Sequence, residues 1–461
     1  MASPPPPNQL EAKYGLPEEV KFCVECVMTN QRPTSCFEFK HTAQSVKSSL
    51  NIRDDGVCDA CHSIKLKEAD IDWKEREREL IALCGKFRRG DGQYDCLVPG
   101  SGGKDSFYAA HMLKYKYGMH PLTVTWAPNM YTSWGWRNLQ SWIGAGFDNY
   151  LCTPNALTHR LLTRLAVENI FHPFQTFILG QKQLAPKLAV RFGIPLVFYG
   201  ENEAEYGNPL ADNKSAQRDL NYFSTSKKED IYLGGVSLRD LEDDFGVPTS
   251  DLSIYLPSET SDFIAHGIQV HYLGYYLKWH PQGAYYYSVE HGGLEPSPER
   301  TPGTYSKYNS IDDKIDDHHY YTTYIKYGIG RCTYDASQEI RNREITRDEA
   351  VLLTKKFDGE YPLRFEKEIF EYLSLPEKQF PIASKMFEQP VMDREYFLHL
   401  ADRFRSPHIW RRVGGLWRLR HTPYSGESDV QYGAPPKAAD VMACTARREE
   451  KHSFIGAARD V

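Results

Sequence analysis

A loop of small residues at positions 100–106 is the part of the chain best suited to bind a phosphate. It follows an apolar run at 94–99, typical of a buried strand, and precedes a stretch from Phe107 with helical periodicity. Glycines let the backbone approach a ligand closely, and the unpaired N–H groups at a helix N-terminus attract negative charge. The loop therefore predicts an anion site, built from Ser101, Gly102, Gly103, Lys104, Asp105 and Ser106.

The residues of this loop exclude the common P-loop. A Walker A motif requires glycine at the position of Val98 and serine or threonine at the position of Asp105. The loop instead resembles the SGGxDS loop of the PP-loop ATP pyrophosphatases. That resemblance implies that residues 101–106 hold the β- and γ-phosphates of ATP, which is cleaved at its α-phosphate. The alternative is a glycine-serine turn that binds nothing.

Short apolar runs alternate with helical patterns along the same part of the chain. The runs lie at 94–99, 122–127, 147–153 and 194–199, and the helical patterns lie at 105–117, 135–144, 156–170 and 180–192. This alternation predicts an α/β fold with a doubly wound parallel sheet, a Rossmann-like nucleotide domain over residues 90–210. Because such sheets bind ligands at the carboxyl ends of their strands, we expect Asn129, Gly200 and Glu201 to lie beside the loop.

Carboxylates at this edge suit the magnesium ion that accompanies ATP, because magnesium prefers carboxylate and phosphate oxygens. Asp105 and Glu201 are the predicted magnesium ligands, with Glu205 behind them, although Glu203 and Glu205 also suit a solvated loop. Lys104 and Asp105 are the predicted catalytic residues, with Lys104 stabilising the charge that develops on the leaving pyrophosphate.

Two CxxC pairs, Cys23/Cys26 and Cys58/Cys61, precede the loop. Four thiolates in two tight turns suit a structural zinc ion in a zinc-ribbon-like module over residues 21–65. An iron–sulfur or redox site and a chance arrangement remain open. A closed shell of four thiolates leaves no position for a substrate, so this metal would stabilise the fold without taking part in the reaction.

The rest of the chain divides by composition. Residues 1–20 are Pro-rich and are expected to be a disordered lead, residues 211–421 a mostly helical substrate and C-terminal region, and residues 422–461 a disordered tail. The formal net charge of −6 gives no general attraction for nucleic acid. No apolar run is long enough for a membrane span and the first residues do not form a signal peptide, so a cytoplasmic protein is expected.

Several blocks, taken with the loop, resemble the N-acetyl sugar amidotransferases of surface-polysaccharide biosynthesis, the WbpG/PseA-like group. The resemblance runs from about residue 22 to about residue 421, and its blocks lie at 126–132, 135–138, 145–150, 159–164, 198–208 and 324–331. It implies conversion of an acetamido group to an acetamidino group, by way of an imidate adenylated by ATP. Both a nucleotide-linked diacetamido uronic acid and a nonulosonic acid are compatible substrates.

The ammonia source is expected to be external. Ala2, not cysteine, follows Met1, and no other cysteine has the setting of a glutaminase nucleophile. The resemblance implies a separate glutaminase and a cyclase-like subunit that channels ammonia.

Two other functions remain open, and two further stretches are ambiguous. A tRNA-thiolating PP-loop enzyme would use a cysteine such as Cys96 or Cys152, and a non-catalytic scaffold of a polysaccharide complex would need no reaction at all. The contiguous acidic run at 312–319 is expected to be a solvated loop rather than a metal site. Lys326 and Arg331 are candidates for contact with an anionic substrate, or else surface residues.

Overall fold

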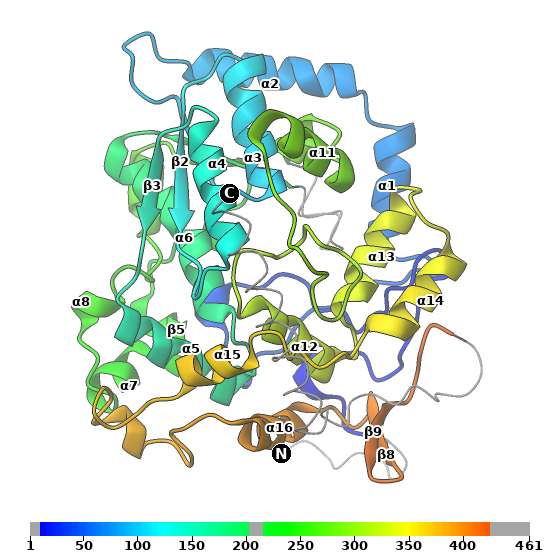
Figure 1. Ribbon diagram of the computed structural model, residues 1–461. Coiled ribbons are helices and arrows are strands. Elements are labelled where there is room, and N and C mark those ends of the chain that lie inside the picture. Colours follow the sequence, from blue (N-terminus) through cyan, green and yellow to red (C-terminus); the bar gives the residue numbers. More distant parts are fainter. Residues whose placement is uncertain (1–9, 202–214, 425–461) are drawn as a thin grey trace, which may run out of the picture.

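The computed structural model describes residues 10–201 and 215–424 (Figure 1). At its centre lies a parallel sheet of five strands in the order β3-β2-β1-β4-β7. The strands are β1 (Cys96–Pro99), β2 (Pro121–Trp126), β3 (Asn149–Cys152), β4 (Leu196–Tyr199) and β7 (Gln269–Tyr272). Leu97 pairs with Leu122 on one side and with Val197 on the other. The α/β fold and four of these strands are confirmed as predicted.

Helices cover both faces of this sheet. One layer consists of α5 (Ala156–Ile170) and α6 (Gln175–Phe192), and the other of α2 (Trp73–Phe87), α3 (Lys104–His111), which continues as a π-helical turn over Met112–Lys116, and α4 (Ser133–Gly144). Leu97 and Val197 pack into the first layer, whereas Val98 and Phe198 pack into the second. Successive strand residues point to opposite faces, and both faces are buried under helices. Residues of both orientations are therefore apolar, and each strand appears in the sequence as a continuous apolar run.

The fifth strand comes from a part of the chain that was not assigned to the sheet. β7 lies beyond the range 90–210 expected for the nucleotide domain, and its Val270 pairs with Val197 of β4. The described residues between β4 and β7 include a two-stranded ribbon and short α-helices, besides two 3-10 turns: β5 (Tyr232–Leu233), β6 (Val236–Ser237), α7 (Leu238–Asp243), α8 (Thr249–Leu252) and α9 (Thr260–Ala265). The strand was not predicted because residues 271–280 are densely aromatic. Such a stretch indicates packing but does not show the two-residue alternation typical of a strand.

The remaining region is mostly helical, as predicted. Its helices are α10 (Leu273–Tyr276), α11 (Pro281–Gly292), α12 (Asp316–Tyr327), α13 (Arg331–Arg341), α14 (Arg347–Phe357), α15 (Glu366–Leu373) and α16 (Arg394–Phe404). An exception is the antiparallel hairpin of β8 (Trp410–Val413) and β9 (Leu416–Leu419), within a stretch expected to be helical. Gly414 and Gly415 both have positive φ, as a two-residue hairpin turn requires.

The cysteine end of the N-terminal module packs on the C-terminal region, whereas its Phe39 packs into the core on the α5/α6 side of the sheet. Its cysteines and α1 (Asp59–Ala69) share a buried cluster with Tyr324 and Tyr327 of α12 and with Trp410 of the hairpin. Residues 10–20 also differ from the disordered lead expected over 1–20: Leu16 is buried, and the Tyr14 hydroxyl donates to the Phe404 carbonyl at 2.6 Å. Of the tail expected over 422–461, the structure describes residues 422–424.

None of the helices within residues 10–201 and 215–424 combines the length and the apolar character of a membrane span.

Candidate functional site

The loop after β1 has a backbone that only glycine accommodates. Gly102 has a φ of +87°, and a Cβ atom there would lie 2.7 Å from the carbonyl oxygen of Asn138 in α4. Gly103 then precedes the first turn of α3, which starts at Lys104. The strand, the glycine turn and the helix N-terminus therefore occur in the order that the sequence predicted for an anion site.

Lys104 and Asp105 are held together at the start of α3. The Lys104 Nζ lies 2.5 Å from Asp105 Oδ2 and 5.8 Å from the centre of the Trp279 ring. The Trp279 indole N–H donates to Asp105 Oδ1 at 2.9 Å. Trp279 thus contacts both predicted catalytic side chains, and it was not among the predicted site residues.

The end of β4 meets this loop. A Cβ atom on Gly200 would lie 2.6 Å from the Asp105 carbonyl oxygen, so only glycine lets the strand end pass so close to α3. Glu201 follows and, like Asp105, lines the cavity described below. The two predicted magnesium ligands are thus brought to one site. Glu203 and Glu205 lie outside the described residues.

Two other predicted contacts point elsewhere. The Ser106 hydroxyl donates to the Gly103 carbonyl at 3.1 Å, inside its own helical turn. The Asn129 amide donates to the Thr163 hydroxyl at 3.3 Å, and its backbone N–H donates to Asp313 at 2.5 Å. Neither side chain is among those that line the cavity.

A cavity of about 570 Å³ opens beside the loop. One wall holds Ser101, Gly103, Lys104, Asp105 and Glu201; the facing wall comes from residues 308–341, including Tyr308, Asp312, Asp316, Tyr320, Arg331 and Asp335; the N-terminal module adds Met28, Arg32 and Leu50. Three parts of the chain therefore build one site, and its volume suits a ligand of nucleotide or sugar size.

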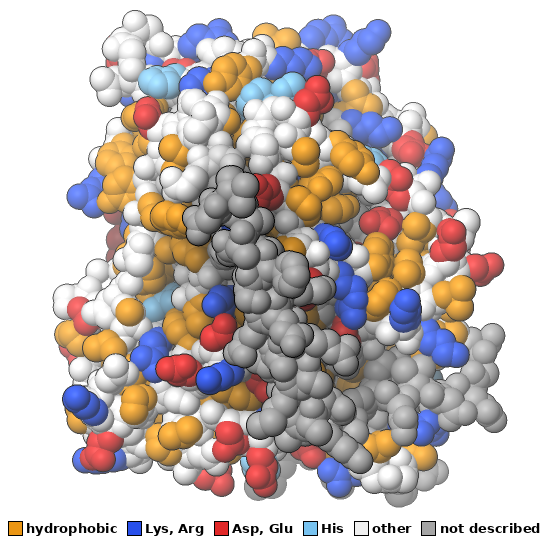
Figure 2. Space-filling view, in the orientation of Figure 1, with side chains coloured by type: hydrophobic (Ala, Val, Ile, Leu, Met, Phe, Trp, Pro, Cys, Tyr) orange, Lys and Arg blue, Asp and Glu red, His pale blue; other side chains and the backbone are white. Residues whose placement is uncertain are grey.

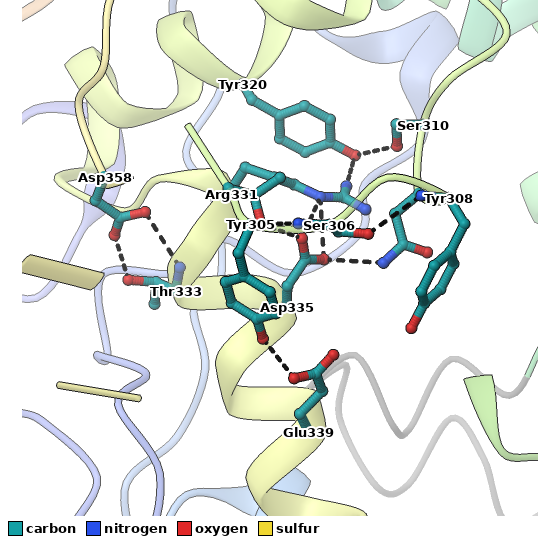
Figure 3. Close-up of polar contacts among 12 residues, drawn as sticks. Tyr305, Ser306, Tyr308, Ser310, Tyr320, Arg331, Thr333, Asp335, Glu339 and Asp358 are labelled. Carbon is teal, nitrogen blue, oxygen red and sulfur yellow. Dashed lines mark hydrogen bonds and ion pairs between the residues drawn. The ribbon is translucent and has the colours of Figure 1, made fainter. Parts of the chain in front are cut away.

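Arg331 lies at the centre of a polar network on the facing wall (Figure 3). Its Nε lies 3.1 Å from Asp335 Oδ1, and its Nη1 donates to the Tyr320 hydroxyl. The Ser310 hydroxyl lies 3.0 Å from the same Tyr320 oxygen. These contacts fix the guanidinium at the cavity. This position agrees with the prediction that Arg331 contacts an anionic substrate, and not with the alternative of a surface residue. Lys326 is instead buried, and its Nζ donates to the Ile170 carbonyl at 2.7 Å, away from the cavity.

The acidic run at 312–319 is not the solvated loop that the sequence suggested. Asp313, Asp316 and Asp317 are all buried, with 2%, 4% and 2% of their surface exposed. Asp317 forms a two-point ion pair with Arg364 at 2.7 and 3.0 Å. Contiguous acidic residues normally face solvent. Here they are buried because residues distant in the sequence bind their carboxyl groups.

Backbone N–H groups hold Asp313 at the edge of the sheet. Its carboxyl accepts from the N–H groups of Asn129, Met130 and Ile315 at 2.5, 3.1 and 3.1 Å. Burial raises the pKa of Asp313 to about 7. Burial also raises the pKa of the neighbouring Asp312 carboxyl, and the Ser101 side chain opposes that rise. The acidic run is therefore anchored to the chain that follows β2 through Asp313.

The four cysteines form a separate, closed cluster. Cys23 and Cys61 have sulfur atoms 3.9 Å apart, and those of Cys26 and Cys58 are 3.8 Å apart. A tetrahedral zinc ion, bound by each sulfur at about 2.3 Å, holds its ligands about 3.8 Å apart. The donor set and the spacing therefore fit zinc, and all four side chains are buried.

Comparison with known proteins places the facing wall of the cavity in a family. Residues 302–422 match the family model described as LPS biosynthesis protein WbpG-like, C-terminal domain. Residues 302–422 are therefore similar to the C-terminal domain of the WbpG-like family. This family points to lipopolysaccharide or polysaccharide biosynthesis, and to an enzyme within it. The resemblance drawn from the sequence blocks is thereby confirmed.

A curated relative of this WbpG-like protein is an uncharacterized protein of Methanocaldococcus jannaschii. The two are 27% identical over 84 residues, which are 18% of this chain and 29% of that protein. So short a match assigns no activity. The family match, in contrast, covers Arg331, Asp316 and the rest of the wall that faces the phosphate loop.

Proposed function

We propose that this WbpG-like protein is an ATP-dependent, AMP-forming amidotransferase. It would convert an acetamido group of a surface-polysaccharide sugar to an acetamidino group through an adenylated imidate and ammonia. The observation that carries the proposal is the shared cavity: the phosphate loop forms one wall and the WbpG-like region forms the other. An ATP-cleaving loop and a family of polysaccharide biosynthesis would therefore act on one bound substrate.

The chain's own residues suit the adenylation step. The loop amides and Lys104 would hold the β- and γ-phosphates and stabilise the charge on the departing pyrophosphate. The acetamido oxygen would attack the α-phosphorus from the side of the facing wall. An amide needs this activation because its oxygen is a poor leaving group, and AMP is a good one.

Asp105 and Glu201 would hold a magnesium ion, which neutralises phosphate charge when it is bound. Both are carboxylates at the cavity, the donor type that magnesium prefers. Trp279 and Lys104 already orient Asp105, so one of its remaining lone pairs would face the ion.

Ammonia would come from a separate glutaminase through a cyclase-like channelling subunit. This part of the proposal rests on the resemblance alone. Purified protein that releases glutamate from glutamine by itself would contradict it.

The tRNA-thiolating alternative is less favoured by the positions of its candidate cysteines. Cys96 is fully buried in β1, and burial raises the pKa of its thiol well above the usual value. Burial also raises the pKa of Cys152, and neither residue lines the cavity. On the face in Figure 2, Lys and Arg side chains are interspersed with Asp and Glu over the described surface, without the basic stripe typical of tRNA binding.

Product analysis by mass spectrometry tests the proposal. Protein, Mg-ATP and ammonium are incubated with diacetamido nucleotide sugars and with nonulosonic acids, and AMP and replacement of one amide oxygen by NH are followed. We expect AMP and a modified sugar in equal amounts from one member of the panel. AMP without a modified sugar, together with retention on tRNA, would favour thiolation, and no AMP from any mixture would favour the scaffold.

A further inference from the structure

Four aspartates lie within residues 312–317, and two of them, Asp312 and Asp316, line the cavity. Asp313 accepts from three backbone N–H groups, and Asp317 pairs with Arg364. Asp316 is 4% exposed and lines the cavity, yet its Oδ1 has no hydrogen-bond partner among the described residues. A buried carboxyl oxygen without a donor costs free energy, so such an atom in a cavity indicates a contact with a ligand.

The backbone around Asp316 is fixed, so the side chain is held in position. Residues 311–315 lie against the chain that follows β2: the Thr132 N–H donates to the Asp312 carbonyl at 3.0 Å, and the Thr132 hydroxyl to the Ile311 carbonyl at 2.6 Å. Asp316 then begins α12. The N–H groups of Asn129 and Met130 also donate to Asp313 in the same segment, so the start of α12 is fixed to the chain that follows β2.

The surroundings favour an N–H donor over a metal ion as the missing partner. The Arg331 guanidinium lies near Asp316 and is itself bound to Asp335 and Tyr320. Among the described residues, no three of the aspartate carboxyls at 312–317 have oxygens within 4.8 Å of one another, as a shared metal ion would require, so a single N–H donor suits the open Oδ1 atom better. An acetamido group presents one such N–H next to the oxygen that reacts.

We propose that Asp316 is the catalytic base that accepts the acetamido N–H proton while the acetamido oxygen attacks ATP. This inference rests on the proposed function. The N–H bond breaks toward Asp316, the C–N bond becomes C=N, and the carbonyl oxygen forms the new bond to the α-phosphorus. The bond from the α-phosphorus to the pyrophosphate oxygen breaks, and the pyrophosphate takes the electron pair. Ammonia later displaces AMP to give the amidinium product.

The charges that face Asp316 suit this role. Burial raises its pKa well above the ordinary value, and the carboxyls of Asp312, Asp313 and Asp317 add to the rise, whereas Arg331 opposes it. An ionised carboxylate with a raised pKa is a stronger base than an ordinary aspartate. The neighbouring His319 also lines the cavity with an unpartnered Nδ1, but burial lowers its pKa to about 3, which makes it a weak base.

The test is pyrophosphate–ATP exchange in the presence of sugar and without ammonia, which measures adenylation alone. For Asp316→Asn we expect the exchange to fall by about 100-fold or more, because general-base catalysis typically contributes that much, and its pH dependence to disappear. Binding of a fluorescent ATP analogue should change less than about threefold, since the phosphate loop is intact. The matched control is Asp348→Asn, the same substitution in the first turn of α14, at an exposed position away from the cavity.

A second variant separates a base from a merely structural residue. For Asp316→Ala, added formate should restore part of the exchange, because a small carboxylate can take the place of the missing base. Asp316→Asn exchange within about threefold of the wild type, or Asp316→Ala activity unmoved by formate, would overturn the inference. Wild-type protein that makes no AMP with any sugar would instead overturn the proposed function, on which the inference depends.

Discussion

The four-cysteine cluster and the cavity wall both bury groups that attract cations or protons, but they do so in opposite ways. The cluster brings four sulfurs to within 4.8 Å of one another and leaves no open side. The wall distributes Asp312, Asp316 and Asp335 around a cavity of about 570 Å³ that a ligand can enter. A closed donor set serves the fold, whereas an open one with an unpartnered atom serves chemistry.

Removal of one thiolate should produce the largest effect of all. For Cys58→Ser we expect loss of the metal and loss of soluble folded protein, because binding of a structural zinc ion contributes about 10–16 kcal/mol in small zinc modules. Elemental analysis and circular dichroism measure both, and absorbance in the visible range would reveal an iron–sulfur cluster. The control is Cys84→Ser, an equally buried cysteine of α2 outside the cluster. Unchanged metal content in Cys58→Ser would show that the four cysteines do not form a zinc site.

Loss of the loop lysine should affect the reaction and spare the fold. For Lys104→Ala we expect AMP formation to fall by about 100- to 1,000-fold, the usual effect of deleting one charge-stabilising group, with an unchanged thermal midpoint. The control is Lys74→Ala, an exposed lysine of α2. If Lys104→Ala keeps full activity, the loop is not an ATP site. A role in the reaction would then no longer distinguish the cavity from the cysteine cluster.

The buried carboxyl of Asp358, which binds the start of α13, should make the free energy of unfolding depend on pH. Asp358 accepts from the Gly330 N–H and from the Thr333 N–H and hydroxyl at the start of α13, and burial raises its pKa to about 7 (Figure 3). The folded protein therefore holds a proton that the unfolded chain releases near pH 4, so the stabilisation is present below pH 4 and lost as the pH rises through 7.

For Asp358→Asn, the stability difference from the wild type should move by roughly 3 kcal/mol in favour of the variant between pH 4.5 and pH 7.5. Urea unfolding at the two pH values measures this change. A difference that stays constant with pH would mean that Asp358 is ionised in the folded protein.

A substitution outside both regions should have the smallest effect. Thr346 and Glu349 form a reciprocal capping box at the start of α14. For Thr346→Ala we expect a loss of about 1 kcal/mol in the free energy of unfolding, with AMP formation and metal content unchanged. A change in either activity or metal content would show that α14 is coupled to one of the two regions.

Local signals in the sequence account for the parts of the molecule that local physics builds. The glycine loop, the CxxC pairs, four parallel strands and the Thr346 cap each depend on a few neighbouring residues, and each is present. The Gly414-Gly415 pair is also a local signal of a hairpin turn, but the hairpin was not predicted.

The facing wall depends on partners distant in the sequence. Asp317 is buried because Arg364 reaches it, and Trp279 orients Asp105 from 174 positions away. No periodicity or spacing near Asp317 or Trp279 encodes those partners. The family resemblance singled out residues 324–331, and so reached Arg331, but it could not say that Lys326 turns inward to the Ile170 carbonyl.

The contacts between residues 10–20 and the far end of the described chain have a consequence for synthesis on the ribosome. The Lys13 N–H donates to the Ser406 hydroxyl at 2.9 Å, and the His408 N–H to the Glu11 carbonyl at 3.3 Å. Lys13 therefore leaves the ribosome 393 positions before the residue to which it docks. A nascent chain can complete the sheet once β7 has emerged, whereas the cysteine module packs on α12 and on the hairpin, which is made after the whole sheet.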